Sequence, residues 1–326
     1  MTAGNAHDSH TTAHDGVIAR MSASTTARIP FSVEFYPPRD EAAEERLWRA
    51  ASVFEQLGAA FVSVTYGAGG TTRDRTLRIT REVADNTALL PIAHLTAVGH
   101  TVEELDALVD EYANAGVHNI LALRGDPPGD PLGEWTQHPG GLRYADELVR
   151  LIGDKRSFEV GVASFPEGHY RAKTLDVDTD VLVSKLRSGA EYSITQMFFD
   201  VDDYLRLRDR VVAADPEQGA KPIIPGLMPV TSLRSVRRML ELSGSKLPAD
   251  FERRLTRAAG SGDTEDRAAV REVGIEFATN LCERLIREGA PCLHFNTLNF
   301  SRATQEVLAN LGMAPEVGAH GGVVLA

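Results

Sequence analysis

The sequence has little of what marks disulfide-stabilised, membrane-spanning or nucleic-acid-binding proteins. Its 2 cysteines are too few for a disulfide framework or a zinc cluster. Its 34 lysine and arginine residues are outnumbered by 46 aspartate and glutamate residues, and the net charge of −12 argues against nucleic acid or an anionic membrane surface as a main partner. No apolar run approaches the roughly 18 residues that a membrane helix needs. These absences predict a cytoplasmic protein with an ordinary buried core.

Residues 1–29 are expected to form a disordered N-terminal tail. They are rich in threonine, serine, alanine and histidine, show no sustained period and lack the apolar centre of a secretory signal. Three histidines, His7, His10 and His14, are compatible with a loose metal site, but their presence in a disordered tail is the simpler interpretation. Residues 30–326 are predicted to form a single catalytic domain.

The body of the chain alternates short apolar runs with segments of helical periodicity. Eight runs rich in β-branched and aromatic residues are predicted to be strands, at 31–35, 61–66, 89–96, 119–124, 158–164, 192–199, 222–229 and 292–298. Eight alternating strand–helix units over about 300 residues predict an α/β fold, a closed (β/α)8 TIM barrel. The longer interval before the last strand is expected to hold extra helices between strands 7 and 8, including 264–289.

A doubly wound open sheet is the competing architecture. Such a sheet normally carries the pattern G-x-G-x-x-G directly after its first strand. Here the first predicted strand runs into Tyr36-Pro37-Pro38, and the pattern occurs nowhere in the chain. The barrel is therefore favoured.

Polar residues gather where the predicted strands end, which is where barrel enzymes place their active sites. Glu34 lies in an apolar run, where burial is expected to raise the pKa of its carboxyl toward that of a general acid. A structural ion pair is its alternative role. After the fourth strand, Arg124 suits a phosphate, Gly125 allows close approach of a ligand, and Asp126 suits the N–H groups of a heterocycle. An Arg–Asp pair that fixes the loop is the alternative there.

Three histidines of the body lie on different predicted strands or loops. His94, His169 and His294 lack the local spacing of metal ligands, so no metal site is predicted. His94 is either a core histidine or a ligand contact. The glycine-rich segment 67–75 enters a helix and is either an anion-binding turn or a flexible loop.

In combination, these motifs resemble the methylenetetrahydrofolate reductases of the bacterial type. The blocks that carry the resemblance span residues 30–315 in the family's order, and they read VEFYPP, FVSVTYGAGGTTRDRT, HLTAVGHT, NILALRGDPP, SFPEGH, ITQMFFD, IIPGLMPV and HFNTLN. The resemblance implies a (β/α)8 barrel that holds FAD at its C-terminal face. It implies reduction of 5,10-methylenetetrahydrofolate to 5-methyltetrahydrofolate in one-carbon and methionine metabolism. NADH or NADPH would reduce the flavin, leave, and be replaced by the folate in a ping-pong cycle.

The resemblance also assigns roles to individual positions and suggests a homo-oligomer. Glu34 is implied as the general acid that helps to open the methylene bridge, Asp126 as a catalytic residue beside flavin and pterin, and Gln196 as a folate contact. These three residues form the implied substrate site. The implied flavin contacts are Thr65, Tyr66, Ala68, His94, Arg124, Gly125, Asp126, Tyr144, Ala145, Phe165, His169, Ala172, Asp178 and Lys185.

Two alternatives to this function stay open. Phe165, Val181 and Ser184 replace residues that carry further polar or basic groups in some family members, so a flavin-independent variant of the same reductase is one alternative. A non-catalytic folate- or flavin-binding barrel is the other, and the intact set of Glu34, Asp126 and Gln196 disfavours it.

Overall fold

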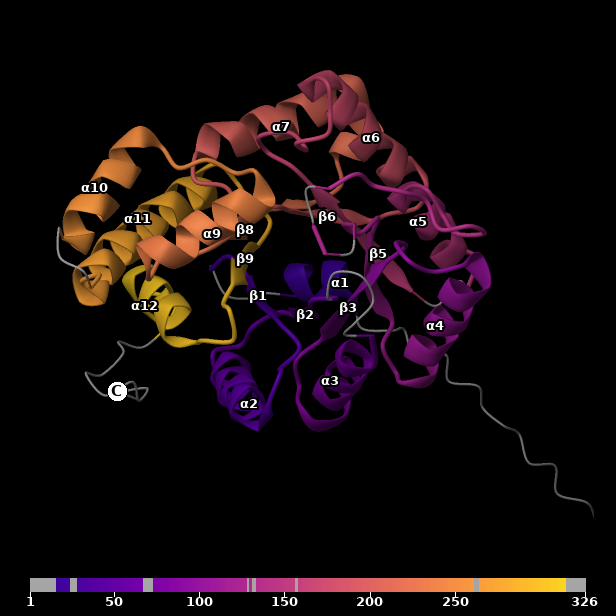
Figure 1. Cartoon of the computed structure of the whole chain (residues 1–326), viewed down its shortest axis with the longest axis horizontal. Coiled ribbons are helices and arrows are strands. Elements are labelled where there is room, and N and C mark those ends of the chain that lie inside the picture. Colours follow the sequence, from indigo (N-terminus) through magenta and orange to yellow (C-terminus); the bar gives the residue numbers. More distant parts are fainter. Residues whose placement is uncertain are drawn as a thin grey trace, which may run out of the picture.

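A ring of parallel strands lies at the centre of the molecule, with helices around it (Figure 1). The structure, a computed structural model, describes residues 16–23, 28–66, 73–127, 129–130, 133–155, 158–260 and 264–314. The sheet order is β7-β6-β5-β4-β3-β2-β1-β9-β8, and all neighbours pair in parallel. The strands are β1 (Phe31–Phe35), β2 (Val62–Val64), β3 (Pro91–Thr96), β4 (Asn119–Leu123), β5 (Glu159–Ser164), β6 (Tyr192–Thr195), β7 (Ile223–Ile224), β8 (Gly226–Leu227) and β9 (Leu293–Asn296).

Strands β7 and β8 are the two halves of the predicted seventh strand. Pro225 separates them, because a proline has no N–H to contribute to the ladder. One half pairs with β6 and the other with β9, so the chain itself joins the two ends of the sheet. The Pro225 carbonyl accepts a hydrogen bond from the backbone N–H of His294 at 3.0 Å. The prediction of a parallel (β/α)8 barrel is confirmed.

Helices follow the strands in the expected alternation. The helices are α1 (Val17–Ser22), α2 (Glu41–Gln56), α3 (Arg73–Asn86), α4 (Val102–Asn114), α5 (Ala145–Gly153), α6 (Leu175–Arg187), α7 (Val201–Ala214), α8 (Pro216–Gly219), α9 (Leu233–Ser243), α10 (Ala249–Ala259), α11 (Arg267–Arg287) and α12 (Arg302–Asn310). The helices α9, α10 and α11 lie between the seventh strand and β9, which confirms the extra helices expected there. Within the described ranges, none of the helices is apolar and long enough to cross a membrane.

Alternation along β1 decides which side chains reach the inside of the barrel. Phe31, Val33 and Phe35 belong to the apolar layer between the strands and the helices, where the ring of Phe35 lies 6.1 Å from that of Phe54 on α2. Successive side chains on a strand point to opposite faces. Ser32 and Glu34 therefore point into the barrel, and the carboxylate lies near its C-terminal end.

Helix α1 lies within the segment that was expected to be disordered. Val17 is fully buried among interior barrel residues that include Ile92 and Tyr192. The N–H of Ile18 donates to Glu159 Oε1 at 3.0 Å, and Glu159 begins β5. Helix α1 therefore covers the N-terminal end of the barrel. The expectation of disorder is wrong for these 6 residues, because a single turn buried by tertiary contact leaves no sustained period in the sequence.

The packing of α11 gives a test of the fold. A Cβ on Gly274 would lie 1.8 Å from the carbonyl oxygen of Val230, whereas a Cβ on Gly153 in α5 would meet no atom within 4 Å. Helix propensity favours alanine at both positions by up to about 1 kcal/mol. We expect Gly274→Ala to lower the free energy of unfolding by about 2 kcal/mol through the clash, and Gly153→Ala to leave it unchanged or raise it. Urea unfolding checks both, and a stabilised Gly274→Ala variant would contradict the packing of α11.

Candidate active site

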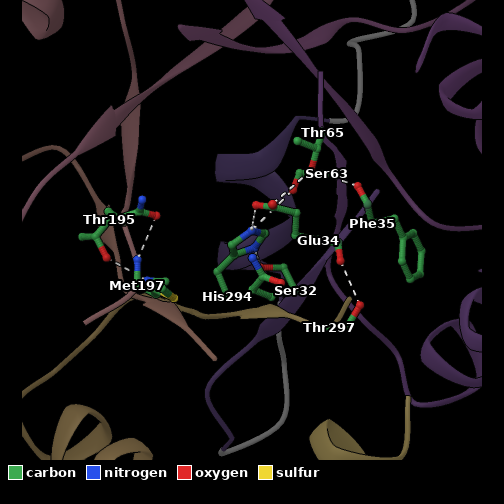
Figure 2. A network of polar contacts seen from close by, with 12 residues as sticks. Ser32, Glu34, Phe35, Ser63, Thr65, Thr195, Met197, His294 and Thr297 are labelled. Carbon is green, nitrogen blue, oxygen red and sulfur yellow. Dashed lines mark hydrogen bonds and ion pairs between the residues drawn. The ribbon is translucent and has the colours of Figure 1, made fainter. Parts of the chain in front are cut away.

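Glu34, the fourth of the five residues of β1, faces His294, the second residue of β9, inside the barrel (Figure 2). The Glu34 Oε2 atom lies 3.6 Å from His294 Nε2, and the histidine side chain is 3% exposed. The other ring nitrogen, Nδ1, lies 2.8 Å from Ser32 Oγ. Nε2 also lies 3.4 Å from Ser63 Oγ. A proton on both ring nitrogens would make the contact with the carboxylate an ion pair.

Further contacts fix the carboxylate from the neighbouring strands. The Thr65 hydroxyl donates to Glu34 Oε1 at 3.0 Å. Buried His94 on β3 acts on the carboxylate through its charge when it is protonated, and burial lowers the pKa of His94 itself. The Thr297 hydroxyl donates to the backbone carbonyl of Glu34 at 2.8 Å. We call Ser32, Glu34, Thr65, His94 and His294 the acid cluster.

The pKa of Glu34 moves in the direction opposite to the one expected. Burial raises it, but the hydrogen bond from His294, the charges of His94 and His294, and the hydroxyl of Thr65 together lower the pKa to about 2. The expectation of a raised pKa is wrong because it counted burial alone. The residue that reverses the shift comes from the last strand, which β1 reaches only when the barrel closes. Glu34 is therefore ionised in the free protein at neutral pH.

A second cluster of charged groups lies after β4 and β5 and on α6. Arg124, Arg171 and Lys185 form no ion pair with a carboxylate in the part of the chain that the structure describes. Lys185 is 7% exposed and donates to the carbonyl of Ala163. Burial lowers the pKa of Lys185 to about 8, while Asp178 and Asp146 act in the opposite direction. We call Arg124, Arg171 and Lys185 the cation cluster.

Aromatic rings line the cation cluster. His169 stacks on Tyr170 with ring centres 4.6 Å apart and meets Phe165 edge-on at 4.7 Å. Burial, followed by the charges of the three cations, lowers the pKa of His169 to about 4, so this ring is neutral at pH 7. The guanidinium of Arg124 lies 5.3 Å from the ring centre of Trp135. The cluster consists of one buried lysine and two half-buried arginines that pair with no carboxylate in the described ranges. Such cations, flanked by flat rings, fit the phosphates and ring systems of a dinucleotide.

The loop after β4 borders the cation cluster. A Cβ on Gly125, whose φ is +84°, would lie 2.4 Å from Val98 Cγ1, so this position requires glycine. The neighbouring Asp126 has a raised pKa because of desolvation, which Arg124 and Arg171 counteract. Asp126 thus lies beside the cation cluster, where it can accept hydrogen bonds from a ligand.

The remaining predicted residues have simpler surroundings. Tyr66 is buried and its hydroxyl lies 3.1 Å from His100 Nε2. Asp178 accepts from the backbone N–H of His169 at 3.2 Å. The Gln196 side-chain oxygen accepts from the N–H of Met197 at 3.2 Å. Tyr144 is the N-cap of α5, and Ala145 is the first residue of that helix. The N–H of Ala172 donates to the backbone carbonyl of His169. Ala68 lies outside the described residues.

Several residues of the site have no role in the sequence interpretation. His294 and Ser32 complete the acid cluster, whereas Arg171 and Trp135 complete the surroundings of Arg124. For Ser32 the sequence did carry a signal, because Ser32 and Glu34 alternate with apolar residues along the first strand and so face the same side. Arg171 and Trp135 lie in loops, where no period indicates their direction. No group of three or more histidine, cysteine, aspartate or glutamate side chains suited to a metal ion occurs among the described residues.

Comparisons with known proteins agree on one family. The sequence model described as "Methylenetetrahydrofolate reductase" matches residues 19–312. The 5,10-methylenetetrahydrofolate reductase of Escherichia coli (strain K12) is 36% identical over 294 residues, which cover 90% of this chain and 94% of the relative. Methylenetetrahydrofolate reductase 1 of Schizosaccharomyces pombe is 35% identical over 292 residues, which cover 89% of this chain and 47% of the relative.

A solved structure shows the same fold. It is an uncharacterized protein from Clostridium thermocellum that binds two copies of 5-methyl-5,6,7,8-tetrahydrofolic acid. Its TM-score is 0.57 at 14% sequence identity, and the match covers 86% of this chain and 93% of that one. At this identity the likeness supports the barrel architecture alone.

The lowered pKa of Glu34 predicts a pH dependence of stability. A carboxyl whose pKa falls from 4.5 to about 2 on folding stabilises the fold above pH 4.5, and this contribution is lost as the pH falls toward 2. We expect Glu34→Gln to be less stable than the wild type by about 2 kcal/mol at pH 7, with a difference that shrinks below pH 4.5. Urea unfolding at a series of pH values measures this difference. A difference that stays constant or grows as the pH falls would contradict the contacts drawn for Glu34.

Proposed function

Because the chain belongs to the methylenetetrahydrofolate reductase family, we propose that it reduces 5,10-methylenetetrahydrofolate to 5-methyltetrahydrofolate, with NADH or NADPH as the source of hydride and FAD as the bound cofactor. The observation that carries the proposal is the acid cluster at the mouth of the barrel. It places a hydrogen-bonded carboxylate and a protonatable histidine where a substrate on the C-terminal face would meet them.

The cation cluster supports the binding of FAD. Lys185, Arg124 and Arg171 would hold the diphosphate, because an anion there would compensate buried and half-buried positive charge that meets no carboxylate within the described part of the chain. His169 and Phe165 would line the same site. Bound FAD would accept hydride from the nicotinamide and supply it to the one-carbon unit. A flavin-independent reductase is the second candidate, but it leaves the buried cations without a role.

The acid cluster would supply the proton that opens the methylene bridge. Protonation of the nitrogen that leaves the bridge converts the one-carbon unit into an iminium cation, which is a good hydride acceptor. Glu34 is ionised at rest, so a proton has to reach it, and His294 is the neighbouring group that can carry one. A folate that covers the mouth excludes water and disfavours the ion pair relative to the neutral pair. The proton then moves to Glu34, which faces the substrate.

Two other residues would position the folate. Asp126 would accept hydrogen bonds from the pterin, and its raised pKa reflects the partly desolvated mouth at which the pterin would lie. Gln196 follows β6 and would contact the folate through its side-chain amide. The homo-oligomeric state and the cytoplasmic location stay predictions.

The role of Glu34 is tested by separating the two half-reactions. We expect Glu34→Gln to keep reduction of the flavin by NADH or NADPH within about twofold, because no proton from the acid cluster is needed in that step. Reoxidation of the reduced flavin by the folate should slow by at least about 100-fold, since general acid catalysis contributes roughly that factor. Stopped-flow absorbance at the flavin band follows both steps. Full folate turnover in Glu34→Gln would show the role to be wrong.

The cation cluster predicts opposite effects on the free and the cofactor-bound protein. Lys185→Met removes a buried charge that has no carboxylate partner, so the melting temperature of the apoprotein should rise. The same change should weaken FAD binding by about tenfold or more through the lost contact to phosphate. Lys155→Met, at a lysine paired with Asp106 and Asp110 on the surface, is the matched control and should leave FAD binding unchanged.

Titration of the apoprotein with FAD, followed by flavin fluorescence, measures these affinities. A colourless protein that does not bind FAD but oxidises NADH only in the presence of folate would support the flavin-independent candidate instead.

A further inference from the structure

Trp135 lies in the long connection between β4 and α5, where other elements fix the chain on both sides of it. Before it, the carbonyl of Gly133 accepts a hydrogen bond from the guanidinium of Arg171, in the loop after β5. After it, the carbonyl of Gly140 accepts from the N–H of Val102, the first residue of α4, at 3.0 Å. These contacts hold the half-buried indole ring against the cation cluster.

The face of the Trp135 ring meets the guanidinium of Arg124. The guanidinium lies over the ring, 5.3 Å from its centre. Burial, followed by the charge of Arg171, lowers the pKa of Arg124, and the smaller opposing charges, Asp126 among them, do not reverse this shift. The surroundings therefore disfavour the cation, and the ring face is the described side-chain contact that stabilises it.

An aromatic face stabilises a cation without occupying its hydrogen-bond donors. A guanidinium carries five N–H donors in one plane, and a carboxylate partner would take two of them and compensate the charge. An indole ring attracts the cation through its quadrupole instead. Arg124 is thus held in position while its charge and its N–H groups stay available to a ligand.

The indole N–H gives independent evidence for the role of the ring. Trp135 Nε1 is buried and has no hydrogen-bond partner among the described residues. A buried tryptophan usually finds an acceptor for this N–H, and a buried donor without one costs free energy. No described hydrogen bond of the indole explains why the ring lies here, whereas its contact with Arg124 does.

We propose that Trp135 is a positioning residue for the anion site of the cation cluster: its ring covers the Arg124 guanidinium, fixes it beside Arg171, and leaves its N–H groups to the diphosphate of the bound dinucleotide. The proposal rests on the proposed binding of FAD at the cation cluster. In the free protein the ring takes the place of a carboxylate partner. On binding, the guanidinium is already directed at the phosphate, so little side-chain freedom is lost.

The variant Trp135→Leu keeps an apolar side chain and removes the ring face. We expect it to weaken FAD binding by about fivefold, because Arg124 then loses its side-chain freedom only when the cofactor binds. Trp135→Phe retains a ring and should stay within about twofold of the wild type. Trp48→Leu, at the half-buried second tryptophan of the chain, on α2, is the matched control and should leave the affinity unchanged. Titration of the apoprotein with FAD measures each affinity.

A double-mutant cycle separates positioning from packing. In an Arg124→Met protein, which has no guanidinium to position, Trp135→Leu should change the FAD affinity little further. If Trp135→Leu weakened binding equally with and without Arg124, the ring would act through packing and the proposal would be overturned. A loss in Trp135→Phe as large as that in Trp135→Leu would overturn it as well, because the phenylalanine keeps a ring face.

The role of Trp135 and the function on which it rests fail in different ways. Unchanged FAD affinity in Trp135→Leu, in a protein where Lys185→Met weakens binding, would overturn the role of Trp135 alone. A wild-type apoprotein that does not bind FAD would overturn the assignment of this cofactor to the cation cluster, and the role of Trp135 with it.

Discussion

The contact between Glu34 and His294 is the interaction on which the rest of the site depends. It joins residues from the two ends of the domain, and it exists only because β1 pairs with β9 when the barrel closes. The pair brings together a buried histidine and a half-buried carboxylate, each of which is hydrogen-bonded by a further side chain. Burial alone would raise the pKa of the Glu34 carboxyl, whereas the contacts from His294, His94 and Thr65 lower it, so that the carboxylate is ionised at neutral pH.

The acid cluster and the cation cluster both contain charges that are removed from water, but among the described residues only the acid cluster supplies the opposite charge from within the protein. A buried charge needs a partner. Glu34 has its partner within the protein and can exchange a proton with it. Lys185 forms no ion pair with a carboxylate among the described residues, and burial lowers its pKa to about 8. Under the proposed function, an anionic cofactor would be the partner of the cation cluster, and the acid cluster would serve proton transfer.

Periodicity and strand-end position were enough to predict the barrel, the extra helices and the location of Glu34 near the end of the first strand. Each of these depends on local pattern or on the general geometry of parallel barrels. The direction of the Glu34 pKa shift was not predictable in this way, because it depends on the distance to a histidine on another strand. Pro225 was visible in the sequence, but that it divides the strand which closes the sheet follows only from the pairing. Helix α1 could not be predicted for a related reason: it is a short helix whose position depends on burial against other parts of the barrel.

The central claim is that Glu34 is ionised in the free enzyme and receives a proton when a folate covers the mouth of the barrel. Infrared difference spectroscopy on binding of tetrahydrofolate, which has no methylene bridge to open, measures this directly. The account predicts that the C=O stretching band of a protonated carboxyl appears on binding in the wild type and is absent in Glu34→Gln. A wild-type protein that binds tetrahydrofolate without gaining this band would contradict the account.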